Sequence, residues 1–405
     1  MIVLVLNCGS SSVKFQLIDC ASGHRASRIG GGKIERIGER ATLTFQAEGQ
    51  PAHRGGEPIA DHEAAVRRVI EWVTGSSGVP RVEAVGHRVV HGGERFTGPA
   101  VVDDEVVAAI EALEPLAPLH NAPALAGIRA SRAHLGPGVP MVAVFDTAFH
   151  ATLPERAARY AIPYEMSLRH RIRRYGFHGI AYRSVLARFG EVTGTPPTEA
   201  RIVALHLGNG ASVAAIERGR SIDTSMGFTP LEGLVMGTRS GDLDPALVSF
   251  LAAQEEMSAA EVVTWLNEHS GLRGVSGVSG DMRDLLEREG EDARARLAVD
   301  MFCYRARKYL GAYLAVLGRL DAVVFSGGIG ERAPVVRARI CAGLEWFGLA
   351  LDHERNERAV GEVGRISGDG TRVSVWVIPA DEELVIAEDA VACLAVPGPR
   401  ARSMA

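Results

Sequence analysis

Lysine is almost absent from this chain of 405 residues. Of its 44 lysine and arginine residues, only Lys14, Lys33 and Lys308 are lysines. The formal net charge is −5, and no five consecutive residues carry charge of one sign. Proteins that bind nucleic acids or anionic membrane surfaces usually carry a basic patch. We therefore expect neither kind of partner, and a lysine inside a motif becomes a candidate for a specific role.

Paired cysteines and long apolar stretches are also missing. The five cysteines are odd in number and show no C-x-x-C spacing, which argues against a disulfide framework and a zinc site. No stretch reaches the ~20 uninterrupted apolar residues of a membrane span. Residues 1–6 lack the basic region of a secretory signal. We therefore expect a cytoplasmic protein.

The sequence does contain a regular alternation of two patterns. Continuous apolar runs, typical of buried strands, occupy residues 2–6, 84–90, 141–145, 202–207, 322–325 and 373–378. Amphipathic patterns, typical of helices, occupy residues 62–74, 104–113, 181–190, 245–256, 258–269 and 291–318. Ser258 and Glu261 form a capping box at the start of one of them. The alternation predicts an α/β fold, and the length predicts two or three domains.

One short pattern occurs twice. Residues 6–13 (LNCGSSSV) and 205–213 (LHLGNGASV) each place a turn rich in Gly, Ser or Asn between an apolar strand and a second strand-like run. Such a hairpin presents backbone N–H groups and hydroxyls at its tip, where they can hold phosphate oxygens. Two ordinary hairpins are the alternative, since short glycine motifs are frequent. The repetition favours duplicated halves that face one shared cleft.

Further motifs follow in a fixed order. They read NCGSSSVK from Asn7, GHRVVHGG from Gly86, LAPLHN from Leu116, FDTAFH from Phe145, RYGFHG from Arg174, HLGNG from His206, DTSMGFTPLEGLVMGTR from Asp223, GIGE from Gly328 and PADEE from Pro379. Together they resemble the acetate kinase family from residue 2 to about 388. The motif at 223–239 is specific by itself, whereas Gly-Ile-Gly-Glu alone is weak.

The resemblance implies a fold and a domain organisation. The family has the actin, sugar-kinase and Hsp70 fold, with two related α/β domains and a nucleotide cleft between them. We therefore expect a first domain from residues 1–147 and 384–405, which carries the first phosphate hairpin. A second domain from residues 148–383 should carry the other phosphate hairpin, the adenosine loops and the interface of a homodimer.

The implied reaction is reversible transfer of the ATP γ-phosphoryl group to acetate, which gives acetyl phosphate and ADP. Acetate is ionised at pH 7 and needs no general base, but its negative oxygen must approach a more negative phosphoryl group. Catalysis should therefore rest on positioning and positive charge. The resemblance assigns it to Arg88, Asp146, His178 and Arg239. A guanidinium can bind carboxylate or phosphate oxygens in a bidentate manner, and Asp146 can orient Arg239 or a hydrated metal.

The other site residues are carried over from matching positions. Beside Arg88, the resemblance implies a small apolar pocket for the acetate methyl group, formed by Val90, Leu119, Phe177 and Pro230. It implies ATP/ADP-binding residues on both hairpins, near the phosphates and around the adenosine: Ser10, Ser12, Lys14, His120, His206, Gly208, Asn209, Gly210, Asp281, Met282, Arg283 and the loop Gly328, Ile329 and Gly330. It also implies Mg²⁺, or Mn²⁺, at Asn7 and Glu382, whose hard oxygen atoms suit it.

These assignments have alternatives. An arginine is usually a solvated surface charge, an isolated histidine is more often a packing residue, and Glu382 can be an acid that complements a helix dipole. A pocket distinguishes one methylene by only ~1–3 kcal/mol, so a propionate or other short-chain acyl kinase is an alternative function. The alternative from another class is a nucleotide-gated binding protein that has lost turnover.

Three departures from the family pattern bear on activity. Residues 180–182 read Ile-Ala-Tyr where Thr-Ser-His is usual, and residues 122–124 read Ala-Pro-Ala where Pro-Pro-Asn is usual. Arg332 follows Gly-Ile-Gly-Glu in place of Asn. The first departure changes the surroundings of His178 and thereby affects the catalytic rate. Arg332 can change the contact with adenine and the nucleotide preference.

Overall fold

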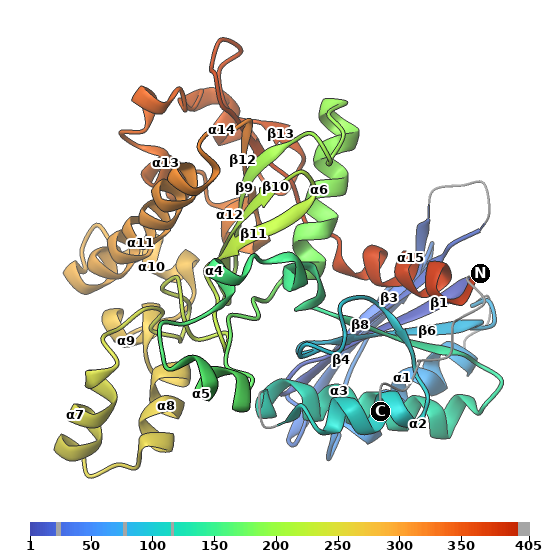
Figure 1. The fold of residues 1–405 in the computed structure, drawn as a ribbon. Helices are drawn as coiled ribbons and strands as arrows, with labels where there is room; N and C mark the ends of the chain where they lie inside the picture. The colour runs from blue at the N-terminus through green and yellow to red at the C-terminus, as the bar shows by residue number, and fades with distance from the viewer. Residues whose placement is uncertain (22–25, 76–78, 115–116, 396–405) are drawn as a thin grey trace. The chain divides into compact units, whose positions relative to one another are not determined.

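The structure is a computed structural model that describes residues 1–21, 26–75, 79–114 and 117–395, with only the backbone of residues 118–120. It divides into two compact units, Met1–Phe149 with the residues from Asp381 onward, and His150–Ala380 (Figure 1). We expected the breaks after residues 147 and 383. The second of these falls inside a helix that begins at Glu382, and the observed break before Asp381 keeps that helix whole.

The first unit is built on an eight-stranded sheet in the order β5-β4-β3-β2-β1-β6-β8-β7. Its strands are β1 (Ile2–Cys8), β2 (Ser12–Asp19), β3 (Ser27–Glu35), β4 (Arg40–Ala47), β5 (His53–Pro58), β6 (Ala84–Val89), β7 (Ala100–Val101) and β8 (Met141–Phe145). Strands β1, β6 and β8 are parallel, and β1 to β5 form an antiparallel series. The sequence patterns located β1, β2, β6 and β8 but missed β3 to β5.

Helices cover both faces of this sheet. They are α1 (His62–Gly75), α2 (Asp104–Glu111), α3 (Pro118–Leu135) and α15 (Glu382–Ala395). Leu4, Leu6 and Cys8 alternate along β1 and join the core that α1 and α3 complete. Gly86 of β6 faces the other way, because a Cβ there would lie 2.6 Å from the side chain of Ile386 on α15. Helix α15 therefore packs closely on the face opposite to α1 and α3.

The second unit repeats the central part of this topology. Its sheet has the order β11-β10-β9-β12-β14-β13. The strands are β9 (Arg201–Leu207), β10 (Ala211–Glu217), β11 (Arg220–Thr224), β12 (Ala322–Ser326), β13 (Gly364–Arg365) and β14 (Ser374–Val377). Strands β11-β10-β9-β12-β14 match β3-β2-β1-β6-β8 in order and in direction. The repeated hairpin pattern in the sequence was thus a trace of two related halves.

Helices of the second unit include the long ones expected from the sequence. They are α4 (Glu155–Ala158), α5 (Tyr164–Arg169), α6 (Gly179–Thr193), α7 (Ala246–Gln254), α8 (Ala259–Glu268), α9 (Gly271–Ser276), α10 (Met282–Arg288), α11 (Ala293–Leu317), α12 (Gly327–Arg332), α13 (Pro334–Cys341) and α14 (His353–Arg358). Short 3₁₀ helices span Ala148–Thr152 and Glu345–Phe347. The capping box of Ser258 and Glu261 is present at α8.

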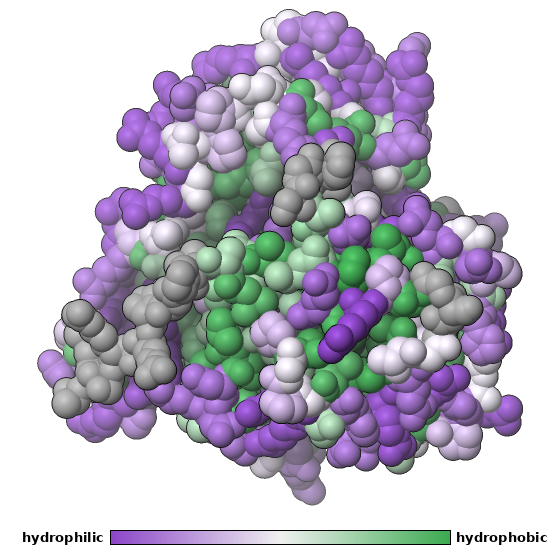
Figure 2. Space-filling view, turned by 90° about the vertical axis from the view of Figure 1, so that its right-hand side faces the viewer, coloured by the Kyte–Doolittle hydropathy of each residue, from purple (hydrophilic) through white to green (hydrophobic). Residues whose placement is uncertain are grey.

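The next features are the cysteines, the lengths of the helices and the surface. The five cysteines are free thiols, and those at 8, 303 and 341 are buried. None of the described helices is both long and apolar enough to cross a membrane. The face drawn in Figure 2 carries hydrophilic residues along its outline, with hydrophobic residues gathered nearer its middle.

Candidate active site

A cluster of polar side chains lies where three parallel strands of the first unit end. Asn7 is near the end of β1, Arg88 is near the end of β6, and Asp146 follows β8. Parallel strands end at one edge of a sheet, where α/β proteins commonly bind ligands. Arg88 donates from Nε to Oδ1 of Asp146 (3.0 Å), from Nη2 to Oδ2 (2.5 Å), and from Nη1 to Oδ1 of Asn7 (3.1 Å). These bonds fix the orientation of the guanidinium.

The bonds leave part of Arg88 available to a ligand. A guanidinium has five N–H groups, and three of them are taken by Asp146 and Asn7. Each terminal nitrogen retains one hydrogen. Oε2 of Glu382 lies 3.6 Å from Nε and adds a second negative charge. Arg88 is therefore held by acids on one side and can bind an anion with its two remaining donors.

Burial and charge act in opposite directions here. Burial by itself would lower the pKa of Arg88, but the carboxylates of Asp146 and Glu382 raise that pKa above its ordinary value. Burial raises the pKa of Glu382, and Arg88 and Lys14 offset only part of that shift. Asp146 is 1% exposed. A neighbouring cation stabilises a buried carboxylate, and the two-bond contact therefore links Arg88 and Asp146.

Asp381 and Glu382, at the start of α15, make different contacts. Asp381 accepts a hydrogen bond from the backbone N–H of Leu384 (3.1 Å) and one from Arg28 (2.7 Å). Asp381 therefore satisfies the helix end, as an N-terminal acid should. Glu382 lies in the first turn as well, but its carboxylate faces Arg88. The interpretation as a helix-end acid therefore holds for Asp381, whereas the role of Glu382 at a metal stays a prediction.

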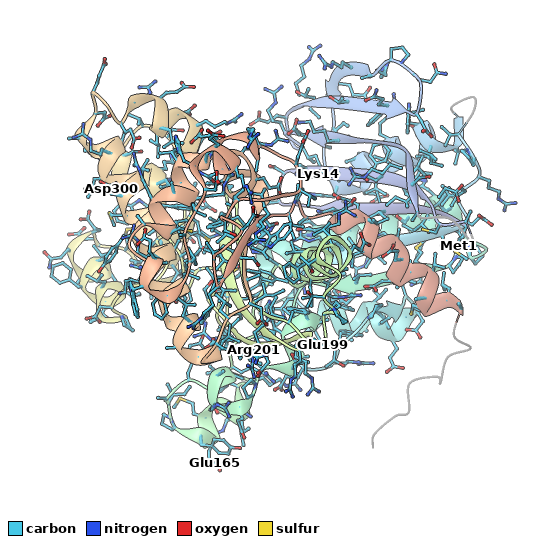
Figure 3. All side chains as sticks on the ribbon, turned by 90° about the horizontal axis from the view of Figure 1, so that it is seen from above. Met1, Lys14, Glu165, Glu199, Arg201 and Asp300 are labelled. Carbon is cyan, nitrogen blue, oxygen red and sulfur yellow. The ribbon has the colours of Figure 1, made fainter. Side chains whose placement is uncertain are left out.

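The first hairpin connects β1 to β2 through a tight turn. The N–H of Gly9 donates to the carbonyl of Ser12 (2.8 Å), and a ring nitrogen of His62 contacts the carbonyl of Gly9 (2.6 Å). Ser10 is exposed at the tip. Lys14, which is labelled in Figure 3, pairs with Asn7 across the hairpin. Residues that pair across two strands have their side chains on one face of the sheet. The structure thus places Lys14 on the same face as Asn7.

The second hairpin connects β9 to β10 through Gly208, Asn209 and Gly210. The N–H of Gly208 donates to the carbonyl of Gly210 (3.0 Å), and the N–H of Gly237 donates to the carbonyl of Asn209 (2.9 Å). A side chain on Gly237 would meet the amide of Asn209, so this close approach requires glycine. The turn is thereby fastened to the 223–239 segment.

His178 and Arg239 meet beside this turn. A Cβ atom placed on Gly210 would lie 3.6 Å from Nε2 of His178 and 3.6 Å from Nη1 of Arg239. His178 precedes α6 with φ +60, a left-handed conformation that is uncommon for a residue other than glycine and often marks a functional position. Its ring lies 4.7 Å from that of His206. Two side-chain nitrogens thus converge on one glycine turn.

Arg239 carries a charge that no described carboxylate balances by an ion pair. Its described hydrogen bonds go from Nη1 to the carbonyl of Pro230 (3.3 Å) and to the sulfur of Met236 (3.9 Å). Burial lowers its pKa. A half-buried guanidinium with neutral partners is unfavourable unless an anion binds. The place beside Gly210 and His178 is therefore suited to a phosphoryl group.

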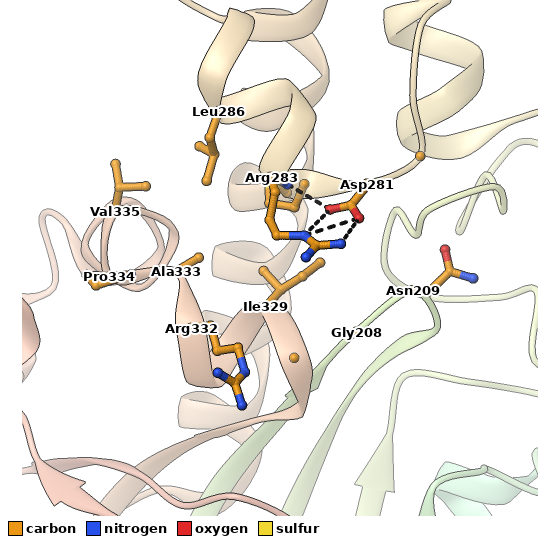
Figure 4. A pocket seen from close by; sticks show the side chains of 13 residues that line it. Gly208, Asn209, Asp281, Arg283, Leu286, Ile329, Arg332, Ala333, Pro334 and Val335 are labelled. Carbon is orange, nitrogen blue, oxygen red and sulfur yellow. Dashed lines mark hydrogen bonds and ion pairs between the residues drawn. The ribbon is translucent and has the colours of Figure 1, made fainter. Parts of the chain in front are cut away.

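A cavity of about 600 Å³ opens on the other side of the second hairpin. Most of its wall is apolar, and it is lined by Gly208, Asn209, Gly280, Asp281, Met282, Arg283, Leu286, Gly328, Ile329, Arg332, Ala333, Pro334 and Val335 (Figure 4). Seven of these are sequence-predicted nucleotide-binding residues. Arg283 donates from Nη2 to Asp281 (2.6 Å), so the two charges cancel within the wall. The size and lining suit a nucleoside.

One local prediction about this cavity was wrong. The Gly328–Gly330 segment was expected to be a loop, but it forms α12. Gly327 has φ +75 and lies too close to Leu207 for a side chain, so the chain can turn from β12 directly into the helix. Gly328 and Ile329 line the cavity, whereas Gly330 faces Phe325 and Leu207.

A buried arginine supports α12 from behind. Arg337 is 0% exposed and makes five hydrogen bonds of 2.7–3.1 Å, all to neutral oxygens. Two of the acceptors are the carbonyls of Gly330 and Glu331, and the others belong to Asn356 and Ala359. Burial lowers the pKa of Arg337 to about 10. It joins the end of α12 to α14.

The predicted methyl-pocket residues belong to both units. Val90 is buried in the first unit, and Phe177 is buried in the second, where Pro230 is partly exposed. The side chains of Leu119 and His120 lie outside the described residues.

Among the residues that shape the site, sequence reasoning missed Ser212, Arg174 and Glu232. Tyr182 belongs to the departure at residues 180–182, which was expected to change the surroundings of His178. Ser212 contacts His178, and Tyr182 contacts Ser212. Arg174 and Glu232 form an ion pair of 2.6 Å, which ties Arg174 to the 223–239 segment that carries Pro230 and Arg239. Tyr182, Arg174 and Glu232 lie in or beside the quoted motifs, so their position was a usable signal. Nothing local marked Ser212.

Known proteins identify the family. The profile of the Acetokinase family matches residues 2–388. The chain belongs to the acetokinase family. An acetate kinase of Solibacter usitatus is 53% identical, over 97% of this chain and 98% of that protein. The crystal structure of Porphyromonas gingivalis acetate kinase is 42% identical with a TM-score of 0.89, covering 97% of this chain and 99% of that one.

A propionate kinase is similar as well. The structure of that enzyme from Francisella tularensis is 37% identical with a TM-score of 0.89, covering 96% of this chain and 99% of the other. These matches and the two related sheets confirm the expected two-domain α/β fold of actin, sugar kinases and Hsp70. Within the acetokinase family, fold similarity therefore does not separate acetate from propionate.

Proposed function

We propose that this chain is a carboxyl phosphotransferase that moves the γ-phosphoryl group of ATP to acetate and gives ADP and acetyl phosphate. A carboxylate oxygen of acetate bonds to the γ-phosphorus as the bond to the bridging oxygen of ADP breaks. The reaction is reversible and involves no proton transfer from acetate, which is already ionised at neutral pH. The protein's part is to position two anions and to balance their charge.

The observation that carries the proposal is Arg239. Its guanidinium is half-buried, has neutral described partners and lies beside the glycine turn at Gly210. In the proposed reaction it binds the transferring phosphoryl group, and His178 donates from Nε2 to the same group. Donors placed where charge accumulates in the transition state contribute more than donors to the substrate alone.

Arg88 is proposed to bind the acetate carboxylate. Asp146 and Asn7 orient it, and Val90, Leu119, Phe177 and Pro230 are proposed to enclose the methyl group. Nucleotide phosphates are assigned to the two hairpins, with Ser10, Ser12, Lys14 and His120 on the first side and His206 and residues 208–210 on the second. The 600 Å³ cavity with Asp281, Met282 and Arg283 is assigned to the adenosine.

A divalent cation is proposed to accompany the nucleotide, as Mg²⁺ or Mn²⁺. Among the described residues no three His, Cys, Asp or Glu side chains are grouped to hold a metal. Asn7, Asp146 and Glu382 nevertheless direct hard oxygens towards Arg88. One or two carboxylates completed by phosphates and water is the usual arrangement for Mg²⁺. The residues therefore fit an ion held by Asn7 and Glu382, which supplies charge neutralisation to the phosphates.

Trapping acetyl phosphate with hydroxylamine tests the reaction. Purified protein with ATP, Mg²⁺ and acetate should give acetyl hydroxamate, and omission of ATP or of the metal should abolish it. Arg239→Ala should lose the activity while keeping the fold, as judged by circular dichroism. No product with acetate, propionate or butyrate would rule the proposal out. Tight ADP binding in that case would support a nucleotide-gated binding protein.

Propionate is the second candidate substrate because a solved propionate kinase matches this chain as well in fold. The ratio of kcat/KM for acetate to kcat/KM for propionate decides between them. Val90 occupies the position where a smaller residue should admit the longer acid, so acetate is the proposed preference.

Assembly and location complete the proposal. We assign the two units to the two family domains and propose a homodimer in the cytoplasm, with neither nucleic acid nor membrane as partner. Helices α7 and α8 support the dimer. Helix α7 buries none of its residues, and Leu247, Phe250, Val263 and Trp265 on the pair are 40–59% exposed. Apolar side chains of this size on adjacent helices are typical of an interface.

A further inference from the structure

Nδ1 of His178 is the first atom in a row of hydrogen bonds that continues through Ser212 to Tyr182. Nδ1 of His178 lies 2.9 Å from Oγ of Ser212, and that oxygen lies 2.5 Å from the hydroxyl of Tyr182. Tyr182 is one helical turn after His178 on α6, and Ser212 is on β10. Ser212 and Tyr182 are buried. Water therefore does not substitute for either contact.

Either oxygen can be the donor between Ser212 and Tyr182, and Nδ1 of His178 can donate or accept. A backbone group of His206 hydrogen-bonds the Tyr182 side chain and opposes the rise in its pKa, as an N–H donor to the phenolic oxygen does. Burial raises the pKa of Tyr182, so the phenol keeps its proton. In one of the two possible arrangements that proton points to Ser212, and the Ser212 hydroxyl donates to Nδ1 of His178. A neutral imidazole that accepts at Nδ1 carries its proton on Nε2.

Nε2 is the nitrogen on the reactive side. It lies beside Gly210 and Arg239, where the phosphoryl group is proposed to bind. We propose that Tyr182 and Ser212 are positioning residues that hold His178 in the tautomer with Nε2 as hydrogen-bond donor. This inference rests on the proposed function. It concerns one chemical property, the tautomer of His178, rather than the presence of the histidine.

The groups around His178 make this property measurable by pH. Its charged and titratable neighbours within the second unit are Arg239, His206, Tyr182 and, beyond Tyr182, His150. Burial lowers the pKa of His150 to about 4, so that ring stays neutral. When His178 itself gains a proton at low pH, Nε2 becomes a donor whatever Nδ1 contacts. We call the row from Tyr182 through Ser212 to Nδ1 of His178 the relay. Protonation of His178 should therefore compensate for loss of the relay.

The test compares Tyr182→Phe and Ser212→Ala with the unaltered chain, using Tyr175→Phe as control. Tyr175 donates its hydroxyl to the carbonyl of Arg171 and takes no part in the relay. Removing such supporting groups typically costs about 10–100-fold in activity. We expect a fall of that size in kcat for Ser212→Ala, a smaller fall for Tyr182→Phe, little change in KM, and no change for the control. The double variant should be no worse than Ser212→Ala, since Tyr182 acts through Ser212.

Two further readouts separate positioning from simple damage to the fold. As the pH is lowered, the defect in kcat should shrink once the ring of His178 takes up a proton. On a His178→Gln background, Tyr182→Phe should cost nothing more. A defect that is constant with pH, or an equal loss on that background, would overturn the relay.

The tautomer can also be read without turnover. Long-range ¹H–¹⁵N spectra of histidine-labelled protein, with His178→Gln for assignment, should show Nε2 protonated in the unaltered chain and a mixture of tautomers in Ser212→Ala. An Nδ1–H ring in the unaltered chain would contradict the relay even if the enzyme is active. Conversely, an Nε2–H ring in a chain that makes no acyl phosphate would leave the relay intact and refute the proposed function.

Discussion

Asp146 grips Arg88 with both carboxylate oxygens, at 3.0 Å from Nε and 2.5 Å from Nη2. The pair connects the ends of two neighbouring parallel strands, so the sheet itself sets the direction of the guanidinium. Asn7 from a third strand adds the remaining bond. An arginine held in this way loses little entropy when it binds an anion, which is how a preorganised site gains affinity.

Replacing Arg88 should separate charge from geometry. Arg88→Lys retains the positive charge but loses the fork, and we expect kcat/KM for acetate to fall about 10²–10³-fold. Arg88→Ala removes the cation that is paired with the buried Asp146, which should cost about 3–5 kcal/mol of folding stability. Arg95→Ala, which breaks a surface ion pair with Glu105, is the control and should change stability by less than ~1 kcal/mol. Steady-state kinetics and thermal unfolding measure both effects, and full activity in Arg88→Lys would contradict the assignment.

Enlarging the methyl pocket should shift the acid preference. Val90→Ala removes two carbon atoms from a buried position, and a methylene of space is worth about 1–3 kcal/mol in discrimination. We therefore expect the ratio of kcat/KM for propionate to that for acetate to rise about 10-fold. Val85→Ala, at a buried position on the preceding strand β6, controls for loss of core packing. An unchanged ratio in Val90→Ala would place the methyl group elsewhere.

Arg337 should control the stability of the nucleotide cavity. Arg337→Gln removes most of the bonds that tie Gly330 and its neighbours to α14 and leaves buried carbonyls without donors. We expect a loss of about 3 kcal/mol or more, or roughly 6–12 °C in Tm for a unit of this size. The KM for ATP should rise, since α12 lines the cavity.

The control for that variant is Arg358→Gln on the adjacent helix, where the arginine side chain is 75% exposed. It should leave both Tm and KM unchanged. If Arg337→Gln lowers Tm but not nucleotide affinity, the arginine supports the fold without shaping the cavity.

Buried histidines should make the protein sensitive to acid. His87 is 1% exposed, and burial lowers its pKa from 6.5 to about 3. Between these two pH values His87 is protonated in the unfolded chain but neutral in the folded chain. Its contribution to the free energy of unfolding is therefore fully present above pH ~6.5 and decreases as the pH falls. We expect a contribution of about 2 kcal/mol at pH 5 from this residue.

His87→Leu tests that linkage because it removes the titrating ring. The stability difference between pH 7 and pH 5, measured by urea unfolding, should be smaller in His87→Leu by about that amount. His53→Leu at an exposed position serves as control. Parallel pH curves for His87→Leu and the unaltered chain would show that His87 titrates normally.

The proposed dimer should depend on the α7–α8 surface. Phe250 is 59% exposed on α7, and Phe250→Asp places a charge where an apolar contact is proposed. Burying an unpaired charge is costly, so light scattering should show monomers in place of dimers. Phe250→Leu should keep the dimer. A dimer that survives Phe250→Asp would place the interface elsewhere.

The sequence by itself determined the elements with strong local patterns. Apolar runs defined β1, β6, β8, β9 and β12 because each lies in the interior of a sheet and is buried on both faces. The two Gly-rich turns defined both hairpins, since backbone conformation there depends on residues adjacent in sequence. The missed strands β3 and β5 have many exposed side chains and five glycines, including Gly30 and Gly55, so neither shows an apolar run.

Only the tertiary structure decided which side chains meet. Asn7, Arg88, Asp146 and Glu382 are up to 375 residues apart in number, and strand register together with the packing of α15 brings them to one edge. The same holds for Ser212, which contacts His178 because α6 packs against β9, the strand that pairs with β10, and not because of any motif. Local spacing fixes periodicity, whereas contacts between distant segments depend on register and packing. Because lysine is scarce, the positive charges of the site are mostly arginines such as Arg88 and Arg239. The planar guanidinium of arginine can bind two oxygens of a carboxylate or phosphate at once.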